Sequence, residues 1–175
     1  DSPYTYKKSK LDCSFTDKVV QHVLKKEEID YSIIPFSIGG SDERQYCSPG
    51  VDLPFVTICR SKYHEYKEYH TSLDDLNFIS ENGLNGSFAI FKNIIRSLEI
   101  NFIYKSKVIG EPFLSDRNLY SSLGFRDNSE FSDLILNTLT YCDGTRNLLE
   151  IVEKINVSIL ELMPIVKILK KENLI

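Results

Sequence analysis

Apolar residues along the first hundred positions follow two different patterns, one with the spacing of helices and one of short continuous runs. Segment 14–28 repeats valine and leucine at helical spacing and predicts a helix with Thr16 as its N-cap. Segments 29–36 and 53–59 are short apolar runs with β-branched and aromatic residues, which predicts strands. Segment 81–103 carries a long amphipathic pattern and predicts a second helix. Helices that alternate with strands predict an α/β layer with a largely parallel sheet.

In the last part of the chain, apolar residues recur only at the spacing of helices. Helices are predicted at about 130–141, from near Asn147 and from near Ser158. The second and third helices each have a glutamate three residues after their first polar position, which is the spacing of a capping box. Pro164 lies inside the third helix and should kink it or delay its start. A small strand is expected to begin at 173–175.

Residues 107–129 separate these two patterns. The segment contains glycine, proline and a pair of serines and shows little periodicity, so we interpret it as a linker. The expected domains are therefore 1–106 and 130–175. A chain of 175 residues is long enough for two small domains of this kind.

The charge and the cysteine pattern restrict the function classes. The net charge is −4, and residues 112–175 hold seven basic against nine acidic side chains, so we expect no nucleic-acid partner. The third helix of this region is mostly apolar, whereas a recognition helix presents polar side chains to base edges. The four cysteines form no C-x-x-C pair, which fits reduced thiols in the cytoplasm. No apolar run reaches about 18 residues, so no membrane partner is expected.

Two polar loops follow the predicted strands, one at 40–50 and one at 61–75. Loops at the ends of neighbouring strands are expected to converge on one edge of a sheet, where α/β enzymes place functional groups. The candidates in the first loop are Asp42, Glu43 and Arg44. They would either orient the residues that contact a metal or substrate, or bind substrate themselves. The alternative is that the two carboxylates form a solvated ion pair with Arg44.

The second loop carries the residue with the most specific chemistry, His70. A neutral imidazole is a good zinc ligand, although a histidine of an exposed loop needs no such role. Tyr69 has a hydroxyl that can donate a hydrogen bond to a developing oxyanion, or its ring covers the loop. Asp74 belongs to the site or caps the following helix, and Ser80 is the other candidate for that cap.

The two loops together resemble a known family. The sequence G-S-D-E-R-Q-Y-C-S-P-G at 40–50, followed by E-Y-K-E-Y-H-T-S-L-D-D-L at 65–76, is similar to a signature of bacterial aminopeptidase-like proteins. Those proteins belong to the di-zinc aminopeptidase group and end in a winged-helix domain. The opening at 4–10 and the tail at 139–175 resemble the same family.

The resemblance implies a fold and a set of roles. The fold would be part of a di-zinc aminopeptidase-like α/β/α sandwich, followed by a small winged-helix-like domain. His70 would be the last zinc ligand, Tyr69 would stabilise the tetrahedral intermediate, and Asp74 completes the motif. The S-D segment of the wider group falls on Ser41 and Asp42, but the group often has histidine where this chain has Glu43.

The implied activity is zinc-dependent hydrolysis of an amino-terminal peptide bond, with two zinc ions that activate a bridging water. The general base and most metal ligands are expected in an upstream segment, so we expect this chain alone to be inactive. The substrate would be a peptide or an amino-acid conjugate, and a homo-oligomer is compatible with the sequence. The alternatives are an inactive scaffold that binds a peptide or sugar ligand, and a winged-helix module for protein interaction or DNA binding.

Overall fold

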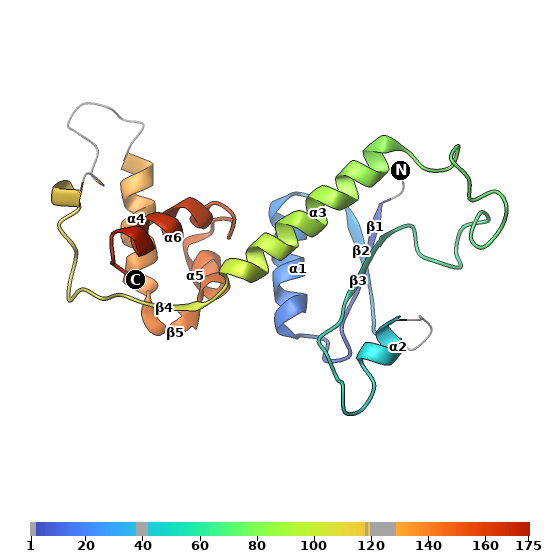
Figure 1. Cartoon of the computed structure of the whole chain (residues 1–175), viewed down its shortest axis with the longest axis horizontal. Helices are drawn as coiled ribbons and strands as arrows, with labels where there is room; N and C mark the ends of the chain where they lie inside the picture. The colour runs from blue at the N-terminus through green and yellow to red at the C-terminus, as the bar shows by residue number, and fades with distance from the viewer. Residues whose placement is uncertain (1–2, 38–41, 118, 120–128) are drawn as a thin grey trace. The chain divides into compact units, whose positions relative to one another are not determined.

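The structure of the protein is a computed structural model, and it describes residues 3–37, 42–117, 119 and 129–175. Contacts within the chain divide it into two compact units, Asp1–Leu98 and Glu99–Ile175 (Figure 1). The expected limits of 1–106 and 130–175 stay a prediction. Within the expected linker, residues 118 and 120–128 lie outside the described part of the chain, as does Ser41 of the first loop.

A three-stranded sheet forms the centre of the first unit, in the order β2-β1-β3. The middle strand β1 (Tyr4–Lys7) pairs with β2 (Tyr31–Ile34) in parallel and with β3 (Thr57–Arg60) in antiparallel orientation. The sheet is therefore mixed, and the expectation of a largely parallel sheet is wrong for β3. Sequence patterns also missed β1, because its four residues alternate aromatic with polar side chains that are all buried.

The direction of the strands decides where the two polar loops begin. Ile34 at the end of β2 lies opposite Lys7, whereas Arg60 at the end of β3 lies opposite Tyr4. The loops that follow these strands therefore leave from opposite ends of the sheet. The expected convergence on one edge fails, because β2 and β3 are separated by β1 and run in opposite directions.

Helix α1 (Phe15–Lys26) begins one position before the predicted N-cap Thr16, with Ser14 as its cap. The reason is a capping box: the Ser14 side chain accepts from the Asp17 backbone, and the Asp17 carboxylate accepts from the Ser14 N–H at 2.8 Å. The same carboxylate accepts from the hydroxyls of Tyr6 and Ser9, which ties the helix to β1 and to the turn after it.

Two further helices complete the first unit. The short α2 (Asp42–Tyr46) follows β2, and the long α3 (Glu81–Ile100) follows the second loop. Ser80 caps α3, because its side-chain oxygen accepts from the Gly83 N–H at 3.0 Å.

The second unit pairs β4 (Ile103–Lys105) with β5 (Asp143–Asn147) in antiparallel orientation and packs helices around this ribbon. The predicted capping box at Asn147 and Glu150 is confirmed. The third helix begins at Leu162, after the expected Ser158, so Pro164 falls in its first turn, where no backbone donor is needed. The remaining elements are η1 (Ser115–Arg117), α4 (Ser129–Tyr141), α5 (Leu148–Ile155) and α6 (Leu162–Lys171).

The end of the second unit is not a strand. The Leu174 N–H donates to the Leu169 carbonyl at 2.8 Å and closes the last turn after α6, so the predicted strand at 173–175 is wrong. The apolar side chains of α5 and α6 form the core together with Ile135 of α4. Among the described helices, none has both the length and the apolar content that crossing a bilayer requires. All four cysteines are free thiols.

Candidate functional site

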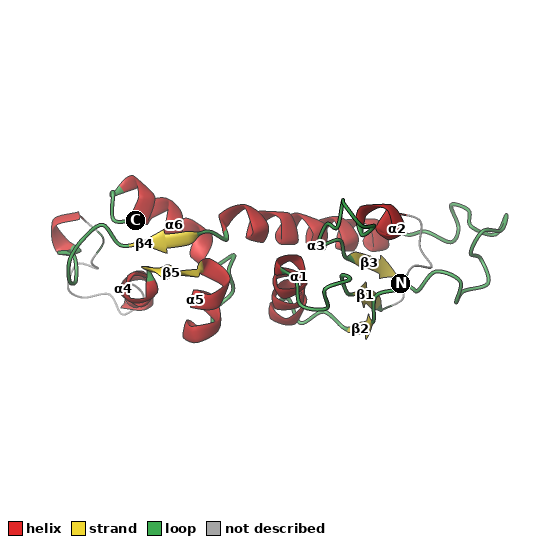
Figure 2. Cartoon of the chain, turned by 90° about the horizontal axis from the view of Figure 1, so that it is seen from below, coloured by secondary structure: helices red, strands yellow, loops and turns green. Residues whose placement is uncertain are grey.

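The segment between β3 and α3 consists of successive turns (Figure 2, where loops and turns are green). Backbone hydrogen bonds between residues three apart join Lys62 to Glu65, Tyr66 to Tyr69, Glu68 to Thr71, Thr71 to Asp74 and Asp75 to Phe78. Each bond satisfies backbone groups locally, as β-turns do. The segment therefore has a defined path without belonging to the sheet or to a helix.

These turns place Tyr69 and His70 in direct contact. Their rings stack with centroids 4.1 Å apart and an interplanar angle of 10°. The ring of His64 lies edge-on to Tyr69 at 4.6 Å and 6.5 Å from the ring of His70. Both histidines are exposed and have left-handed backbones, with φ of 68° at His64 and 55° at His70. Such φ values are uncommon outside glycine and are found at binding loops.

Tyr66 connects this pair of rings to the neighbouring surface. Its ring lies 5.5 Å from that of Tyr69 and stacks on Phe78 at 5.6 Å. Burial and the negative charge of Asp74 raise the pKa of Tyr66, so its hydroxyl stays protonated at neutral pH. A protonated phenol can donate a hydrogen bond to a ligand.

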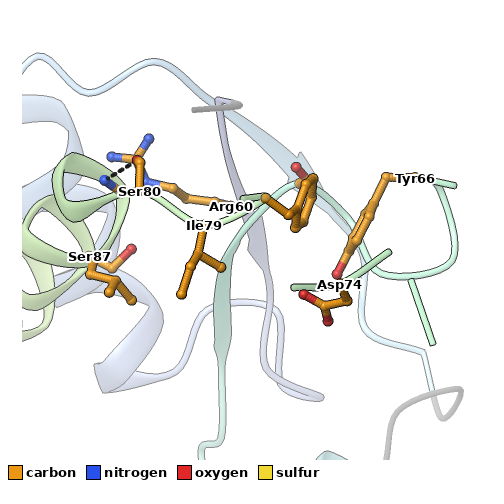
Figure 3. Close-up of a pocket in the computed structure, with 10 residues that line it drawn as sticks. Arg60, Tyr66, Asp74, Ile79, Ser80 and Ser87 are labelled. Atoms are coloured by element: carbon orange, nitrogen blue, oxygen red, sulfur yellow. Dashed lines mark hydrogen bonds between the residues drawn. The ribbon is translucent and has the colours of Figure 1, made fainter. Parts of the chain in front are cut away.

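Beside Tyr66 lies an open cavity of about 290 Å³ (Figure 3). Tyr66 and Asp74 stand at one end of the cavity and Ser80 and Ser87 at the other, with Ile79 between them. The Asp74 carboxylate points toward the Tyr66 hydroxyl. Asp74 is thus part of this cavity, and the alternative role as a helix cap belongs to Ser80. The mixture of a carboxylate, hydroxyls and apolar side chains suits a small amphipathic ligand.

One side of the cavity comes from Arg60, the last residue of β3, which contacts Tyr4 of β1 and approaches α3 at Gly86. Arg60, which also lines the cavity, places its guanidinium 4.3 Å from the centre of the Tyr4 ring. A methyl group added at Gly86 would meet Arg60 Nη2 at 2.6 Å and the Tyr4 hydroxyl at 3.1 Å. Glycine at this position therefore allows α3 to approach β1 and β3.

The candidates of the first loop lie in a different environment. Asp42 and Arg44 are exposed, whereas Glu43 is buried and forms an ion pair with Lys7 at 2.5 Å. The Lys7 ammonium also donates to the Tyr63 hydroxyl at 2.9 Å. The partner of Glu43 is thus Lys7, whereas the sequence had offered Arg44.

The pair between Lys7 and Glu43 is charged. Burial acts to raise the pKa of Glu43, but the hydrogen bond and charge of Lys7 lower it overall. Burial acts to lower the pKa of Lys7, but the bonds with Glu43 and Tyr63 raise it overall. Sequence reasoning missed Lys7 and Tyr63; the signal available was a lysine within the alternating run Y-T-Y-K.

We tested whether the described residues fit a metal. His70 is the predicted ligand, but no cluster of three His, Cys, Asp or Glu side chains suited to a metal occurs in the part of the chain that the structure describes. A catalytic zinc takes about three protein ligands. The described residues thus do not hold such an ion by themselves, and a metal at His70 would need further ligands from outside them.

Two family models match this chain. A model described as a domain of unknown function (DUF4910) matches residues 1–101, and a model described as a winged helix-turn-helix matches residues 102–175. The division between the matches lies close to the division between the two units. The second unit is accordingly a helical winged-helix domain, and the whole chain is a mixed α/β protein.

A curated protein and a solved structure, both from Clostridium acetobutylicum, are similar to the chain. One is provisionally named a polysaccharide biosynthesis protein with an aminopeptidase-like domain, and it is 34% identical over 151 residues, which are 85% of this chain and 35% of that protein. The other is a crystal structure of a provisionally assigned peptidase, with a TM-score of 0.78 and 30% identity over 99% of this chain and 38% of the other. The chain therefore spans just over a third of the length of each.

Proposed function

The chain belongs to the family described as a domain of unknown function (DUF4910), and on that premise we propose that its first unit is part of the catalytic domain of a zinc-dependent aminopeptidase. The observation that carries the proposal is the stacked pair of Tyr69 and His70 beside a cavity of ligand size. The names of the curated Clostridium acetobutylicum protein and of the solved structure, one aminopeptidase-like and one a peptidase, support the same activity class.

In this proposal each residue has one role. His70 is exposed on its loop, so its imidazole is accessible as one ligand of a metal site that other residues complete. Tyr69 is held against His70 by stacking, so its hydroxyl lies near the same site and donates to the oxyanion that forms during peptide hydrolysis. Preorganised donors of this kind act because no reorganisation is needed at the moment of reaction.

The cavity would receive the amino-terminal residue of the substrate. Asp74 offers a carboxylate to the substrate ammonium group, and the apolar side chains of Ile79 and Leu84 offer a surface for the substrate side chain. Asp42 and Arg44 are exposed residues of α2, so their part in substrate binding stays a prediction, while Glu43 of the same helix supports the sheet through Lys7.

A second candidate is a binding module that holds a peptide or sugar-linked ligand without hydrolysis, and it rests on the cavity lined by Tyr66 and Asp74. The cavity and the rings around Tyr66 would then bind the ligand without catalysing a reaction. The two candidates differ in metal content, which makes that content the decisive quantity.

The test is a chimera in which this chain replaces the matched segment of the crystallised Clostridium acetobutylicum peptidase. Zinc per molecule is measured by elemental analysis, and hydrolysis of a leucine anilide is measured in parallel. We expect about two zinc ions, one of which is lost in the His70→Ala variant together with activity. His64→Ala is the matched control, because His64 is also an exposed histidine with a left-handed backbone.

The 175-residue chain alone should bind no stoichiometric zinc and hydrolyse no anilide. A folded chimera without zinc, or equal losses in the His64 and His70 variants, would contradict the metal assignment. Ligand binding that persists in such a metal-free chimera would support the binding module.

A further inference from the structure

Helix α3 has two apolar faces, and one of them is uncovered. Ile90 and Ile94 are 4% and 6% exposed and pack into the first unit. On another face, Leu84, Phe88, Phe91 and Ile95 are exposed by 60%, 68%, 45% and 55%. We call these four residues the α3 stripe. Their spacing of four, three and four residues places them on one side of a helix.

The α3 stripe is too large to be an ordinary surface feature. It spans three turns, about 16 Å along the helix axis. It contains two phenylalanines, and the Lys92 ammonium lies 5.9 Å from the centre of the Phe88 ring. Exposed apolar side chains on proteins usually occur singly. A contiguous patch of this kind marks a surface that another polypeptide covers.

The stripe also continues into the candidate site. Leu84 belongs both to the stripe and to the lining of the cavity, and Phe78 and Ile79 extend the exposed apolar surface toward Tyr66. A polypeptide on the stripe would therefore close one side of the cavity and lie next to the loop of Tyr69 and His70.

We propose that the α3 stripe is the docking surface for a polypeptide equivalent to the part of the longer relatives that this chain does not span. The matched segment is 35% of the similar protein and 38% of the solved chain, so well over half of each lies outside it, and the solved structure shares this fold at a TM-score of 0.78. A partner of that size has its own core and can present apolar side chains to the stripe. A second copy of this chain is the rival occupant.

The docking itself rests on exposure and helix geometry, independently of catalysis. Its consequence for the site rests on the proposed function: the docked polypeptide brings to His70 the ligands that the described residues lack. Docking and metal binding can be separated, because the stripe and His70 are different residues.

The experiment compares the double variant Phe88→Ser/Phe91→Ser in two proteins, this chain and the chimera described above. Serine and phenylalanine have similar helix propensities, so the change mainly removes apolar surface. In the isolated chain the residues are exposed, and we expect the melting temperature to change by less than about 1 °C. In the chimera we expect a decrease of at least about 5 °C, because buried apolar contacts are lost.

Asn85→Ser is the matched control, since Asn85 is exposed on α3 outside the stripe. It should leave both melting temperatures unchanged. The same double substitution at the aligned positions of the unmodified crystallised relative repeats the measurement in a protein known to fold. Equal, small shifts in all three proteins would overturn the proposal.

Two further measurements, sedimentation and zinc content, distinguish docking of the proposed polypeptide from dimerisation and separate docking from metal binding. Sedimentation of the isolated chain should show a monomer; a dimer that the double variant dissociates would make a second copy the occupant and overturn the proposal. In the chimera, His70→Ala should remove zinc and leave the melting shift caused by the stripe variant intact. If zinc binding fails while the stripe shift remains, docking stands and the proposed function falls.

Discussion

The two units of this protein bury different kinds of side chain. The first unit buries the ion pair of Lys7 with Glu43 and the carboxylate of Asp17, while it leaves the α3 stripe exposed. The second unit closes around nine described aliphatic side chains that are at most 1% exposed: Ile135, Leu148, Ile151, Val152, Ile159, Leu162, Ile165, Leu169 and Leu174. The first unit buries apolar side chains too, among them Tyr6, Val19 and Leu24, so the two units differ in the charged groups that they bury.

The largest effect should come from the buried ion pair. Glu43→Gln leaves the buried Lys7 charge without its counter-charge, and we expect the free energy of unfolding of the first unit to fall by about 4 kcal/mol. Hydrogen exchange resolved by segment measures this for each unit separately. The matched control is Asp52→Asn, which removes the exposed pair with Lys10 at 2.7 Å and should cost less than about 1 kcal/mol. Equal losses from both substitutions would show that burial of the pair does not matter.

A smaller effect, confined to the second unit, should follow removal of core volume. Ile151→Ala leaves a cavity in a fully buried site and should lower the unfolding free energy of this unit by about 3 kcal/mol. Ile95→Ala on the α3 stripe removes the same atoms from an exposed site and should change stability by less than about 0.5 kcal/mol. Chemical denaturation of both variants checks the contrast. A large loss at Ile95 in the isolated chain would mean that the stripe is covered.

The smallest of the three effects concerns acid. Burial alone would raise the pKa of Asp17, but hydrogen bonds from Ser14, Ser9 and Tyr6 lower it to about 2 from an ordinary 3.8. A lowered pKa contributes stability above pH 4, here about 2 kcal/mol, which is lost as the pH falls from about 4 to 2. Unfolding of the first unit followed from pH 6 to 2 should show this loss. Asp17→Asn should remove about 2 kcal/mol of this loss and leave the part that belongs to Glu43, whose pKa is lowered as well. A variant that loses as much stability as the wild type would assign the titration to another group.

Local features of the fold were predictable from the sequence. One such feature is the capping box of Asn147 and Glu150, and another is the late start of the helix that contains Pro164. Each depends on residues within one turn of each other. The helix that begins near Phe15 was found for the same reason, although its cap is Ser14. Patterns within one helix contain this information, because propensity and capping act over three or four residues.

Features that depend on distant pairing were not predictable. Strand β1 is stabilised by two partners and by a lysine whose counter-charge lies 36 residues away, so its own sequence does not resemble a buried strand. The antiparallel direction of β3 likewise has no signature within 53–59. In the candidate site, the adjacency of Tyr69 and His70 was visible in the sequence. The cavity was not, because it is lined by residues of α3 together with Arg60 of β3, which are distant in the sequence.

Gly86 has a consequence for what the cavity can hold. It does not line the cavity, yet it sets the separation between α3 and Arg60, which do. A larger residue would have to move the end of the flexible Arg60 side chain and come close to the Tyr4 hydroxyl. A larger side chain at Gly86 would therefore act on the cavity through Arg60, which lines it, although Gly86 itself does not.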